Sequence, residues 1–454
     1  MLYDSERGEI TLALAGDIML TRQLSVFKEA RFLQLCELFR GADASFANFE
    51  SCAHEYPEGS PTVARGTCMT TEPKLLADMK WFGINIVSTA NNHAFDYGED
   101  GVLACIRHLD EAGVPHAGTG RNLREARSPA YLDTRGGRVA LIAATAFFNE
   151  WNQAGEQRAD LQGRPGVNPL AFESSYVVDA KTMDELKRMG TALGFEADKE
   201  RHRNFGFISA AELGVDSKKE YHFLGKKFTG GAKFAVETKA SEQDIAGNLR
   251  QVREARRQAD WVIVSLHNHE MGGPTLLTAR KRTEMEECAS FVKDFAHRCI
   301  DEGADVFIGH GPHVALGMEL YKGKPIFYSL GDFIMQNETV RFFPAHGYSR
   351  FGLDENATPA DFLDARSDRD TKAHPADPLF WQTICAVCKF ASGKLKQITL
   401  YPVDIGYGRP RPQRGRPLIA DAKTGEEIIA RIARLSKDLG TEVVYRDGCG
   451  IVGL

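Results

Sequence analysis

Short apolar runs of strand length recur along the chain, and stretches with the periodicity of amphipathic helices separate them. Apolar runs of this length that are rich in β-branched residues are typical of buried strands. Within residues 100–112 the apolar side chains recur at spacings of three and four, as on one face of a helix. We expect strands at 10–15, 44–49, 84–89, 139–144, 261–266, 305–308, 325–330 and 381–390, and helices at 72–82, 98–112, 242–259 and 283–302. This alternation predicts a layered α/β fold.

Two long segments break the alternation. Residues 149–239 are charged and weakly periodic, and residues 337–377 have no clear period and are rich in Asp, Arg, Pro, His and aromatic side chains. Loops of this size are uncommon in compact domains unless they are functional or disordered. We therefore interpret both segments as insertions over one mouth of the sheet.

The C-terminal part of the chain has a different character. Residues 408–417 (GRPRPQRGRP) predict a stiff, basic linker or a crossing at the edge of the sheet. A helix at 425–439 and a short strand at 442–445 are expected to follow. The expected organisation is one large domain at 1–405, which carries the two insertions, and a C-terminal appendage at 406–454 packed on it.

Composition excludes several classes of protein. The 56 Lys and Arg against 62 Asp and Glu give a net charge of −6, which argues against nucleic acid as the main partner. The 43% hydrophobic and 26% charged residues are typical of a soluble, folded protein. The charged N-terminal residues predict no secretory signal, and no run is long enough for a membrane span.

The cysteines point to a reducing compartment. The nine cysteines are scattered and odd in number, which favours free thiols in the cytoplasm over a disulfide framework. The one close pair, Cys385 and Cys388, lies in a strand-like run, so we interpret it as core packing.

Polar residues gather at the carboxyl ends of the predicted strands. In open α/β sheets these ends converge on one crevice, where ligands bind. Six separate segments therefore point to a shared site. The residues concerned are Asp17, Asn48, Glu50, Asn91, Asn92, His93, His267, His269, His310, His313 and Asp332.

The types of side chain at these positions indicate metal binding and proton transfer. Asparagine carbonyls and imidazoles are usable metal ligands, and a histidine also serves as a general acid or base near neutral pH. His267 and His269 share one face of a strand, and His310 and His313 flank a tight Gly-Pro turn. Imidazole ligands suit ions of the zinc, manganese, iron or nickel class.

The same residues resemble a known protein family. The elements GD, NFE, NNH-x-x-DYG, GHGPH and YSLGDF, in this order over residues 10–404, are similar to those of the bacterial CapA/PgsA proteins of capsule and poly-γ-glutamate synthesis. That family is similar in turn to calcineurin-like metallophosphoesterases, which bind two metals. The resemblance implies a four-layer αββα metallophosphoesterase-like sandwich instead of a single doubly wound sheet.

The resemblance also implies roles for individual residues. It makes Glu50 the candidate bridging carboxylate, His93 the candidate proton donor, and His310 a ligand or second proton-transfer group. The sequence departs from the phosphoesterase pattern at Met19, where that pattern has a histidine, and from the common CapA pattern at Asp332, an additional carboxylate. The implied metal ligands are Asp17, Glu50, Asn92, His267 and His313; the catalytic candidates are His93, His310 and Asp332; further candidates are Asn48, Asn91, Asp96, His269 and Glu270.

Substrate contacts are less clearly marked. Arg65, Arg341 and Arg350 lie on predicted loops, and a guanidinium pairs planar carboxylates or phosphates bidentately. The apolar residues 342–344 of the second insertion are interpreted as part of a lid.

The leading hypothesis is a cytoplasmic hydrolase that depends on divalent Mn, Zn or Fe and acts on an amide, peptide or phosphoester substrate, with His93 as general acid. Its partner would be a small molecule or peptide that carries a carboxylate or phosphate, and self-association into a homo-oligomer is compatible with the sequence. One alternative is an epimerase in which His93 and His313 act as acid and base. Another is a non-catalytic poly-γ-glutamate binding or assembly protein.

Overall fold

The computed structural model describes residues 8–62, 66–206, 214 and 216–454, and these divide into two compact units. The first unit comprises residues 1–171, 242–270 and 293–454, and the second comprises residues 172–241 and 271–292. The C-terminal residues 406–454 thus belong to the same compact unit as the first strands of the chain. The boundary that we expect near residue 405 stays a prediction.

The larger sheet of the first unit has ten strands. Its order is β25-β26-β23-β22-β1-β2-β5-β6, with β21 paired to β1 and β24 paired to β23. β1 runs parallel to β2 and β21 and antiparallel to β22. The bounds are β1 Ile10–Met19, β2 Ala44–Phe49, β5 Ile86–Ser88, β6 His116–Ala117, β21 Asp332–Met335, β22 Gln382–Ala391, β23 Lys394–Asp404, β24 Leu418–Ile419, β25 Val443–Arg446 and β26 Cys449–Val452.

The smaller sheet of the first unit has six strands in the order β19-β20-β18-β15-β9-β8. Its central strand β15 runs parallel to β9 and β18, so the carboxyl ends of these three strands lie at one edge. The bounds are β8 Ala130–Thr134, β9 Gly137–Thr145, β15 Trp261–His267, β18 Val306–His310, β19 Met318–Tyr321 and β20 Lys324–Phe327. Two short pairs complete the unit, β3 Cys52–Ala53 with β4 Thr70–Thr71 and β7 Thr119–Gly120 with β10 Gly166–Val167.

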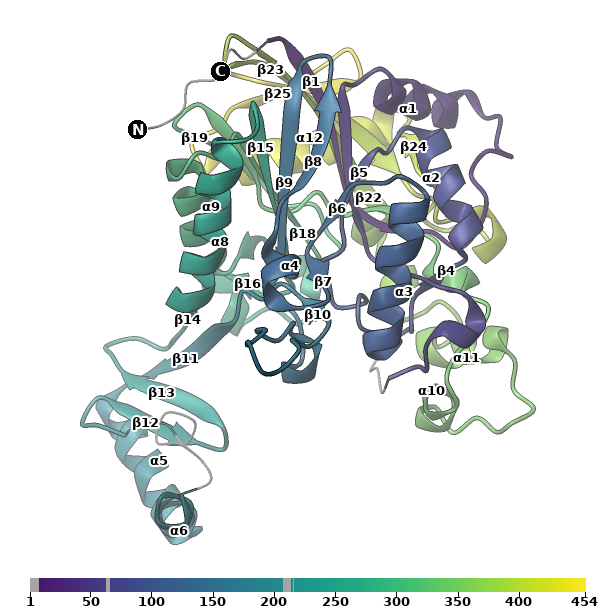
Figure 1. The fold of residues 1–454 in the computed structure, drawn as a ribbon. Coiled ribbons are helices and arrows are strands. Elements are labelled where there is room, and N and C mark those ends of the chain that lie inside the picture. Colours follow the sequence, from purple (N-terminus) through teal and green to yellow (C-terminus); the bar gives the residue numbers. More distant parts are fainter. Residues whose placement is uncertain (1–7, 63–65, 207–213, 215) are drawn as a thin grey trace. The chain divides into compact units, whose positions relative to one another are not determined.

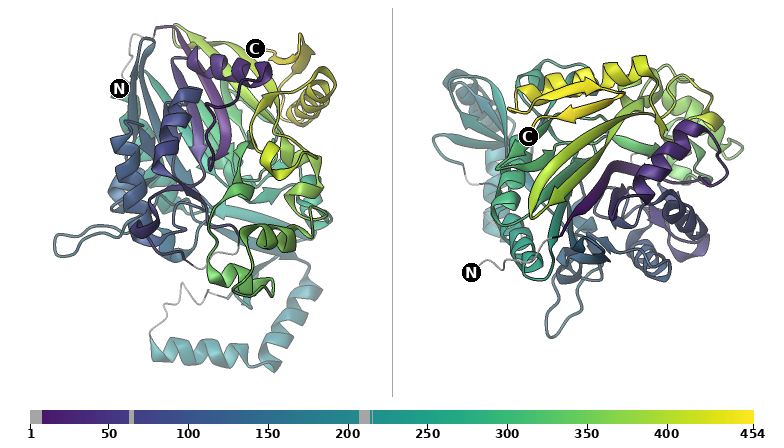
Figure 2. Two further views of the ribbon diagram at one scale, coloured as in Figure 1. Left: turned by 90° about the vertical axis from the view of Figure 1, so that its right-hand side faces the viewer. Right: turned by 90° about the horizontal axis from the view of Figure 1, so that it is seen from above.

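The two sheets share one apolar core, to which Leu12, Phe46, Leu141, Ile263 and Ile308 contribute buried side chains. Helices α8 and α9 lie on one side of the sheets, and α1, α2 and α3 lie on the other side (Figures 1 and 2). Helix α12 packs on β23 and β25. The bounds are α1 Ala30–Arg40, α2 Leu76–Phe82, α3 Gly98–Glu111, α4 Leu123–Arg127, α8 Glu242–Arg256, α9 Ser290–Asp301 and α12 Ala422–Lys437. The mixed α/β class predicted from the periodicity is confirmed.

The second unit is small and has its own sheet, of order β12-β13-β11-β14. Its buried cluster is built around Val178, Met183, Tyr221 and Phe223. Much of the segment 149–239, which we predicted as an insertion, therefore forms regular structure. The bounds are β11 Phe172–Val178, α5 Ala180–Ala192, α6 Phe195–Phe205, β12 Glu220–Phe223, β13 Lys226–Gly230, β14 Ala235–Ala240, β16 Met271–Gly272 and β17 Glu287–Cys288.

The second predicted insertion, 337–377, contains two short helices and forms ion pairs with a buried arginine. α10 spans Ala345–Arg350 and α11 spans Pro359–Ser367. Arg414 is only 4% exposed, and it contacts Glu338 at 2.5 Å and Asp370 at 3.0 Å. Part of the charge of the basic segment 408–417 is thus buried against acidic groups of the insertion.

We expect that Arg414→Leu destabilises the first unit by about 3 kcal/mol, because removing one partner of a buried ion pair leaves carboxylates without their compensating charge. Urea denaturation followed by circular dichroism measures the change. Arg409→Leu is the matched control in the same segment, since its side chain forms no ion pair with any described residue, and we expect it to shift stability by less than about 0.5 kcal/mol. Equal midpoints for the two variants would contradict this role of Arg414.

Cys385 and Cys388 lie inside β22, which pairs on both sides with β1 and β23. Their side chains are 1% and 0% exposed, and burial raises the pKa of both thiols far above the usual range. We expect both to resist iodoacetamide in the native protein at pH 8, because the thiolate is the reactive form. Peptide mass spectrometry should find modification first at Cys449, which is partly exposed, and early labelling of Cys385 would overturn this interpretation.

Among the described residues, none of the helices has both the length and the apolar character that crossing a bilayer requires.

Candidate metal centre

The strands bring their polar carboxyl ends together in the first unit. In register, Asp17 of β1 lies beside Asn48 of β2 and beside Asp332 of β21, and His267 of β15 lies beside His310 of β18. The approach of β1 to β21 requires glycine at position 16, because a Cβ there would lie 1.9 Å from the carbonyl oxygen of Gly331. The GD element thus lies inside β1, near its carboxyl end, and places the carboxylate of Asp17.

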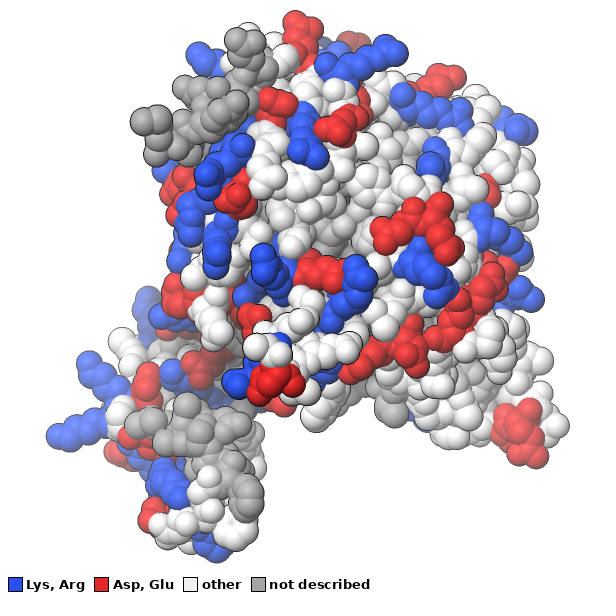
Figure 3. Space-filling view, in the orientation of Figure 1, with Lys and Arg blue, Asp and Glu red and all other residues white. Residues whose placement is uncertain are grey.

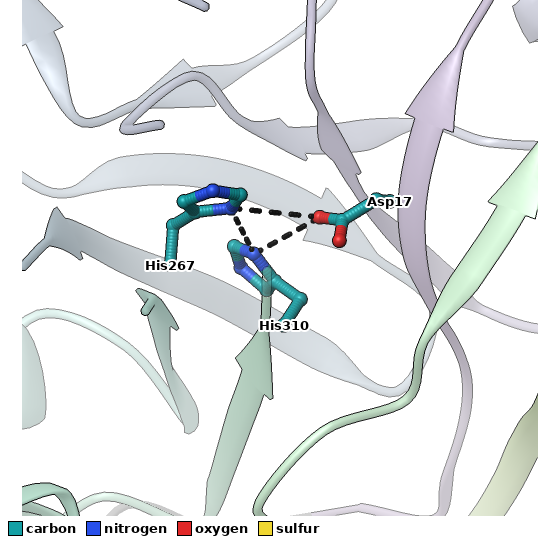
Figure 4. Close-up of side chains that lie close together, drawn as sticks. All are labelled: Asp17, His267 and His310. Carbon is teal, nitrogen blue, oxygen red and sulfur yellow. Dashed lines mark hydrogen bonds and ion pairs between the residues drawn. The ribbon is translucent and has the colours of Figure 1, made fainter. Parts of the chain in front are cut away.

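Asp17, His267 and His310 form the most compact group (Figure 4). The Nδ1 atom of His310 lies 3.2 Å from Oδ1 of Asp17, the Nδ1 atom of His267 lies 3.6 Å from it, and the two Nδ1 atoms are 3.0 Å apart. A tetrahedral ion with metal–ligand bonds of about 2.0–2.1 Å separates its ligand atoms by roughly 3.3 Å. All three side chains are completely buried. Their spacing and chemistry therefore fit one shared cation.

Neighbouring groups fix the orientation of this cluster. The side-chain amide of Asn48 donates to Oδ1 of Asp17 at 2.7 Å, and the backbone N–H of Gly311 donates to Oδ2 of Asp17 at 2.9 Å. The hydroxyl of Ser265 lies 2.7 Å from Nε2 of His310. Partners of this kind set which ring nitrogen of a histidine is free to bind a metal.

Two further groups of possible ligands adjoin the first and share residues with it. Glu50, His267 and His269 form one, and Asp17, Glu50, His313 and Asp332 form the other. In each group the ligand atoms lie within 4.8 Å of one another. Because Asp17, Glu50 and His267 each belong to more than one group, the arrangement offers two neighbouring cation positions.

The electrostatics of the cluster favour a cation. Burial, together with the charges of Asp17, Asp332 and Asp96, raises the pKa of Glu50 well above its usual range. Neither carboxylate oxygen of Glu50 accepts a hydrogen bond from any described residue. Burial of a carboxylate without a partner is costly unless a proton or a cation neutralises it.

The pKa values of Asp17 and His267 move in the directions that a ligand set requires. Burial raises the pKa of Asp17, but hydrogen bonds from His267 and His310 outweigh it and hold that pKa well below the usual value. Burial lowers the pKa of His267 to about 4. The carboxylate is therefore ionised and the imidazole neutral near pH 7, which are the forms that bind metals.

His93 stands at the edge of the cluster in a different setting. Its Nδ1 atom lies 2.6 Å from Oδ2 of Asp96, and its Nε2 atom lies 3.8 Å from Oε1 of Glu50. Asp96 is itself fixed, because it accepts a hydrogen bond of 2.7 Å from the backbone N–H of Met69. One nitrogen of His93 is thus oriented by a carboxylate while the other faces the cluster, an arrangement suited to proton transfer.

The two asparagines before His93 have separate surroundings. The amide of Asn91 donates to the carbonyl of Phe49 at 2.8 Å and to Oδ1 of Asn48 at 3.3 Å. The buried Oδ1 atom of Asn92 accepts no hydrogen bond from the described residues, as expected for an amide oxygen that binds a cation. Its role as a ligand stays a prediction.

The other predicted site residues lie in varied positions. The imidazole of His313 is 2.9 Å from Asp332, and its backbone has a left-handed φ of +63°. Among the described residues, Glu270 belongs to none of the three groups. Arg341 forms an ion pair with Glu72, Arg350 ends α10, and Arg65 falls outside the described residues.

The structure adds three residues that the sequence did not indicate. Phe147, which is 41% exposed, stacks on the ring of His269 with centroids 4.2 Å apart. His374, in the second insertion, lies against His313, with the centroids of the two rings 4.9 Å apart. Ser265 had a detectable signal, because it shares a strand face with His267 at a spacing of two. The partners of Phe147 and His374 are distant in sequence, so no local pattern could reveal them.

Related proteins and a family model match most of this chain. The uncharacterized protein y4sH of Sinorhizobium fredii (strain NBRC 101917 / NGR234) is 30% identical over 98% of this chain and 93% of its own length. The capsule biosynthesis protein CapA of Bacillus anthracis is 23% identical over 74% of this chain and 62% of its own length. The PGA biosynthesis protein CapA of Bacillus subtilis (strain 168) is 22% identical over 73% of this chain and 65% of its own length. The family model for the bacterial capsule synthesis protein PGA_cap matches residues 11–337, a span that holds every residue of the three candidate ligand groups. The chain therefore belongs to the PGA_cap family of bacterial capsule synthesis proteins.

Proposed function

We propose that the protein is a hydrolase that depends on divalent metal ions and cleaves an amide, peptide or phosphoester bond. The observation that carries this proposal is the buried group of carboxylates and imidazoles with the His93–Asp96 pair at its edge. A bound divalent ion would polarise a carbonyl or phosphoryl oxygen and lower the pKa of a water. The mixed nitrogen and oxygen donors suit Mn, Zn or Fe.

The chain's own residues divide the remaining work. Asp17, His267 and His310 would hold one ion, and Glu50 with His269, His313 and Asp332 would contribute to a second. His93 would donate a proton to the leaving group from Nε2, while Asp96 keeps the ring oriented. Asn92 would add an amide oxygen to the ligand set.

The named relatives support a substrate class. Two of them carry names from capsule and PGA biosynthesis, so we propose a γ-glutamyl amide as the first substrate to test. The two sheets with one core and helices on both sides support a four-layer αββα sandwich of the metallophosphoesterase type. On the face in Figure 3, basic and acidic side chains are mixed. The expectations of a cytoplasmic location, of no nucleic-acid partner and of self-association stay predictions.

A metal-reconstitution assay tests the proposal. The protein is stripped with dipicolinate, reloaded with Mn²⁺, Zn²⁺ or Fe²⁺, and assayed on poly-γ-glutamate, γ-glutamyl-p-nitroanilide and bis-p-nitrophenyl phosphate. We expect turnover of at least one substrate after reloading and none before it. Turnover that persists undiminished in stripped protein would contradict a metal-dependent mechanism.

The structure also favours a second candidate, an epimerase. Two histidine–aspartate pairs, His93 with Asp96 and His313 with Asp332, border the group that contains Glu50. Such a pair could remove and return a proton at an α-carbon. Incubation of a glutamyl peptide in D₂O distinguishes the two reactions, because deuterium at the α-carbon without bond cleavage would support epimerisation.

A further inference from the structure

The first unit contains a cavity of about 370 Å³ whose walls include none of the candidate metal ligands. Its lining combines the segment after β3 with the start of the second insertion, and four aromatic rings contribute to it, those of Tyr56, Tyr97, Phe342 and Phe343. Small-molecule sites typically have volumes of about 300–1,000 Å³, apolar walls and a few polar groups. The cavity therefore has the size and the lining of a ligand pocket.

A buried histidine supplies the polar group of this cavity. His54 lines it and is only 5% exposed. Its Nδ1 atom lies 3.0 Å from the hydroxyl of Thr70 and 3.4 Å from the carbonyl of Cys52, and its ring lies on Tyr97 with centroids 3.9 Å apart. The Nε2 atom forms no hydrogen bond with any described residue. One polar atom of a nearly buried side chain is thus left for a ligand.

The charge of the cavity favours a neutral ligand. Three charged side chains line the cavity: Arg341 is paired with Glu72, and Glu55 is exposed, so its carboxylate stays in water. Burial lowers the pKa of His54, which keeps the imidazole neutral near pH 7. Among the described lining residues, no buried charge is therefore left to pair with a charged ligand.

Two of the aromatic side chains that line the cavity are exposed and come from different segments. Tyr56 is 79% exposed and Phe342 is 50% exposed, and their ring centroids are 5.6 Å apart. Exposed aromatic rings at the mouth of a cavity can cover a planar ligand and gain apolar burial in doing so.

We propose that this pocket binds a neutral aromatic ring that carries a hydroxyl group, that is, a ligand of the phenol class. The ring would pack among the four aromatic side chains and the hydroxyl would bond to Nε2 of His54. A hydroxyl both donates and accepts, so it satisfies Nε2 in either tautomer of the imidazole. The ligand would be either a free phenol or the side chain of a tyrosine in a peptide.

This inference does not rest on the proposed hydrolysis, although the pocket lies next to the His93–Asp96 pair in the fold. Tyr97 follows Asp96 in the chain, and the carbonyl of Asp96 accepts a hydrogen bond of 2.8 Å from the backbone N–H of Thr62. The pocket is therefore tested by binding, without any assay of turnover.

The test compares p-cresol with toluene, which lacks the hydroxyl, by ligand-observed NMR on the full chain. We expect p-cresol to bind about tenfold more tightly, as one additional hydrogen bond allows. Phe342→Ala should lower the affinity for p-cresol at least about fivefold, because the ring contact is lost. Phe234→Ala removes a similarly exposed ring outside the cavity, so it should leave this affinity unchanged. Equal affinity for the two probes, no binding of p-cresol, or an unchanged affinity in Phe342→Ala would each overturn the proposal.

His54→Leu identifies the polar partner, because it should reduce the affinity for p-cresol to that for toluene. If this variant does not fold, the Phe342→Ala comparison still tests whether the pocket binds p-cresol. N-acetyl-tyrosinamide against N-acetyl-phenylalaninamide separates the two sources of the ring: binding of the tyrosine derivative as tightly as p-cresol assigns the pocket to a peptide side chain, and binding of p-cresol alone assigns it to a free phenol.

Discussion

Asp17→Asn is expected to abolish stoichiometric metal binding while leaving the metal-free protein folded. Oδ1 of Asp17 lies near the Nδ1 atoms of both His267 and His310, and Asp17 belongs to two of the three candidate ligand groups. The substitution removes the charge of the carboxylate but keeps its shape. We expect metal affinity to fall by more than about 100-fold, since even the loss of partners that only orient ligands costs about 10- to 100-fold.

Two measurements test this expectation. Inductively coupled plasma mass spectrometry gives the metal content after dialysis, and thermal denaturation with and without added metal gives the stabilisation by binding. An ion at 100 times its dissociation constant should stabilise the wild-type protein by about 2.7 kcal/mol, and at the same concentration it should stabilise the variant by less than about 0.4 kcal/mol. Asp133→Asn is the control, because the side chain of Asp133 is 83% exposed and lies outside the three groups.

The metal-free proteins should differ much less. In the wild-type protein the charge of Asp17 contributes to raising the pKa of Glu50, so the two carboxylates repel one another. An asparagine at position 17 relieves this repulsion but loses one hydrogen bond, because Asn48 and Gly311 donate to different oxygens of Asp17 and the amide has a single oxygen. The two effects oppose one another, so without metal we expect the stability of the variant to stay within about 1 kcal/mol of the wild type. Normal metal content in Asp17→Asn would contradict the assigned centre.

The sequence was informative where chemistry follows directly from a strand. His267 and His310 end their strands, Asp17 and Asn48 lie within the last three residues of theirs, and parallel strands place their carboxyl ends at one edge of a sheet. The expected strand at 44–49 matches β2 Ala44–Phe49, and that at 261–266 is one residue shorter than β15 Trp261–His267. Local periodicity therefore predicted both the elements and the residues that they carry.

The sequence was less informative where contacts between residues distant in the chain determine the structure. Arg414 and Glu338 lie 76 residues apart, and only the fold turns a basic, Pro-rich segment into a buried ion pair. The stacking of Phe147 on His269 and the contact of His374 with His313 depend equally on tertiary structure. Segment 149–239 was predicted as a weakly periodic insertion, because strands such as β13 Lys226–Gly230 are short and contain no fully buried residue.

His93→Gln is expected to slow turnover by about 10²- to 10⁴-fold, the usual contribution of a general acid, while the metal content stays normal. His93 lies outside the three candidate ligand groups, so its loss should not release an ion. Asp96→Asn should give a smaller decrease, because the imidazole remains but loses the carboxylate that orients it.

The leaving group provides the sharper test of the acid role. A glutamyl amide with an alkylamine leaving group must be protonated as its bond breaks, whereas p-nitrophenolate departs without a proton. His93→Gln should therefore slow turnover of the alkylamide strongly and turnover of a p-nitrophenyl ester only slightly. His297→Gln is the matched control: His297 on α9 also faces a carboxylate, with Nε2 2.9 Å from Glu319, but neither residue belongs to the candidate centre. Equal losses with both leaving groups would show that His93 positions the substrate or the metal instead of donating a proton, because only proton donation depends on the basicity of the departing atom.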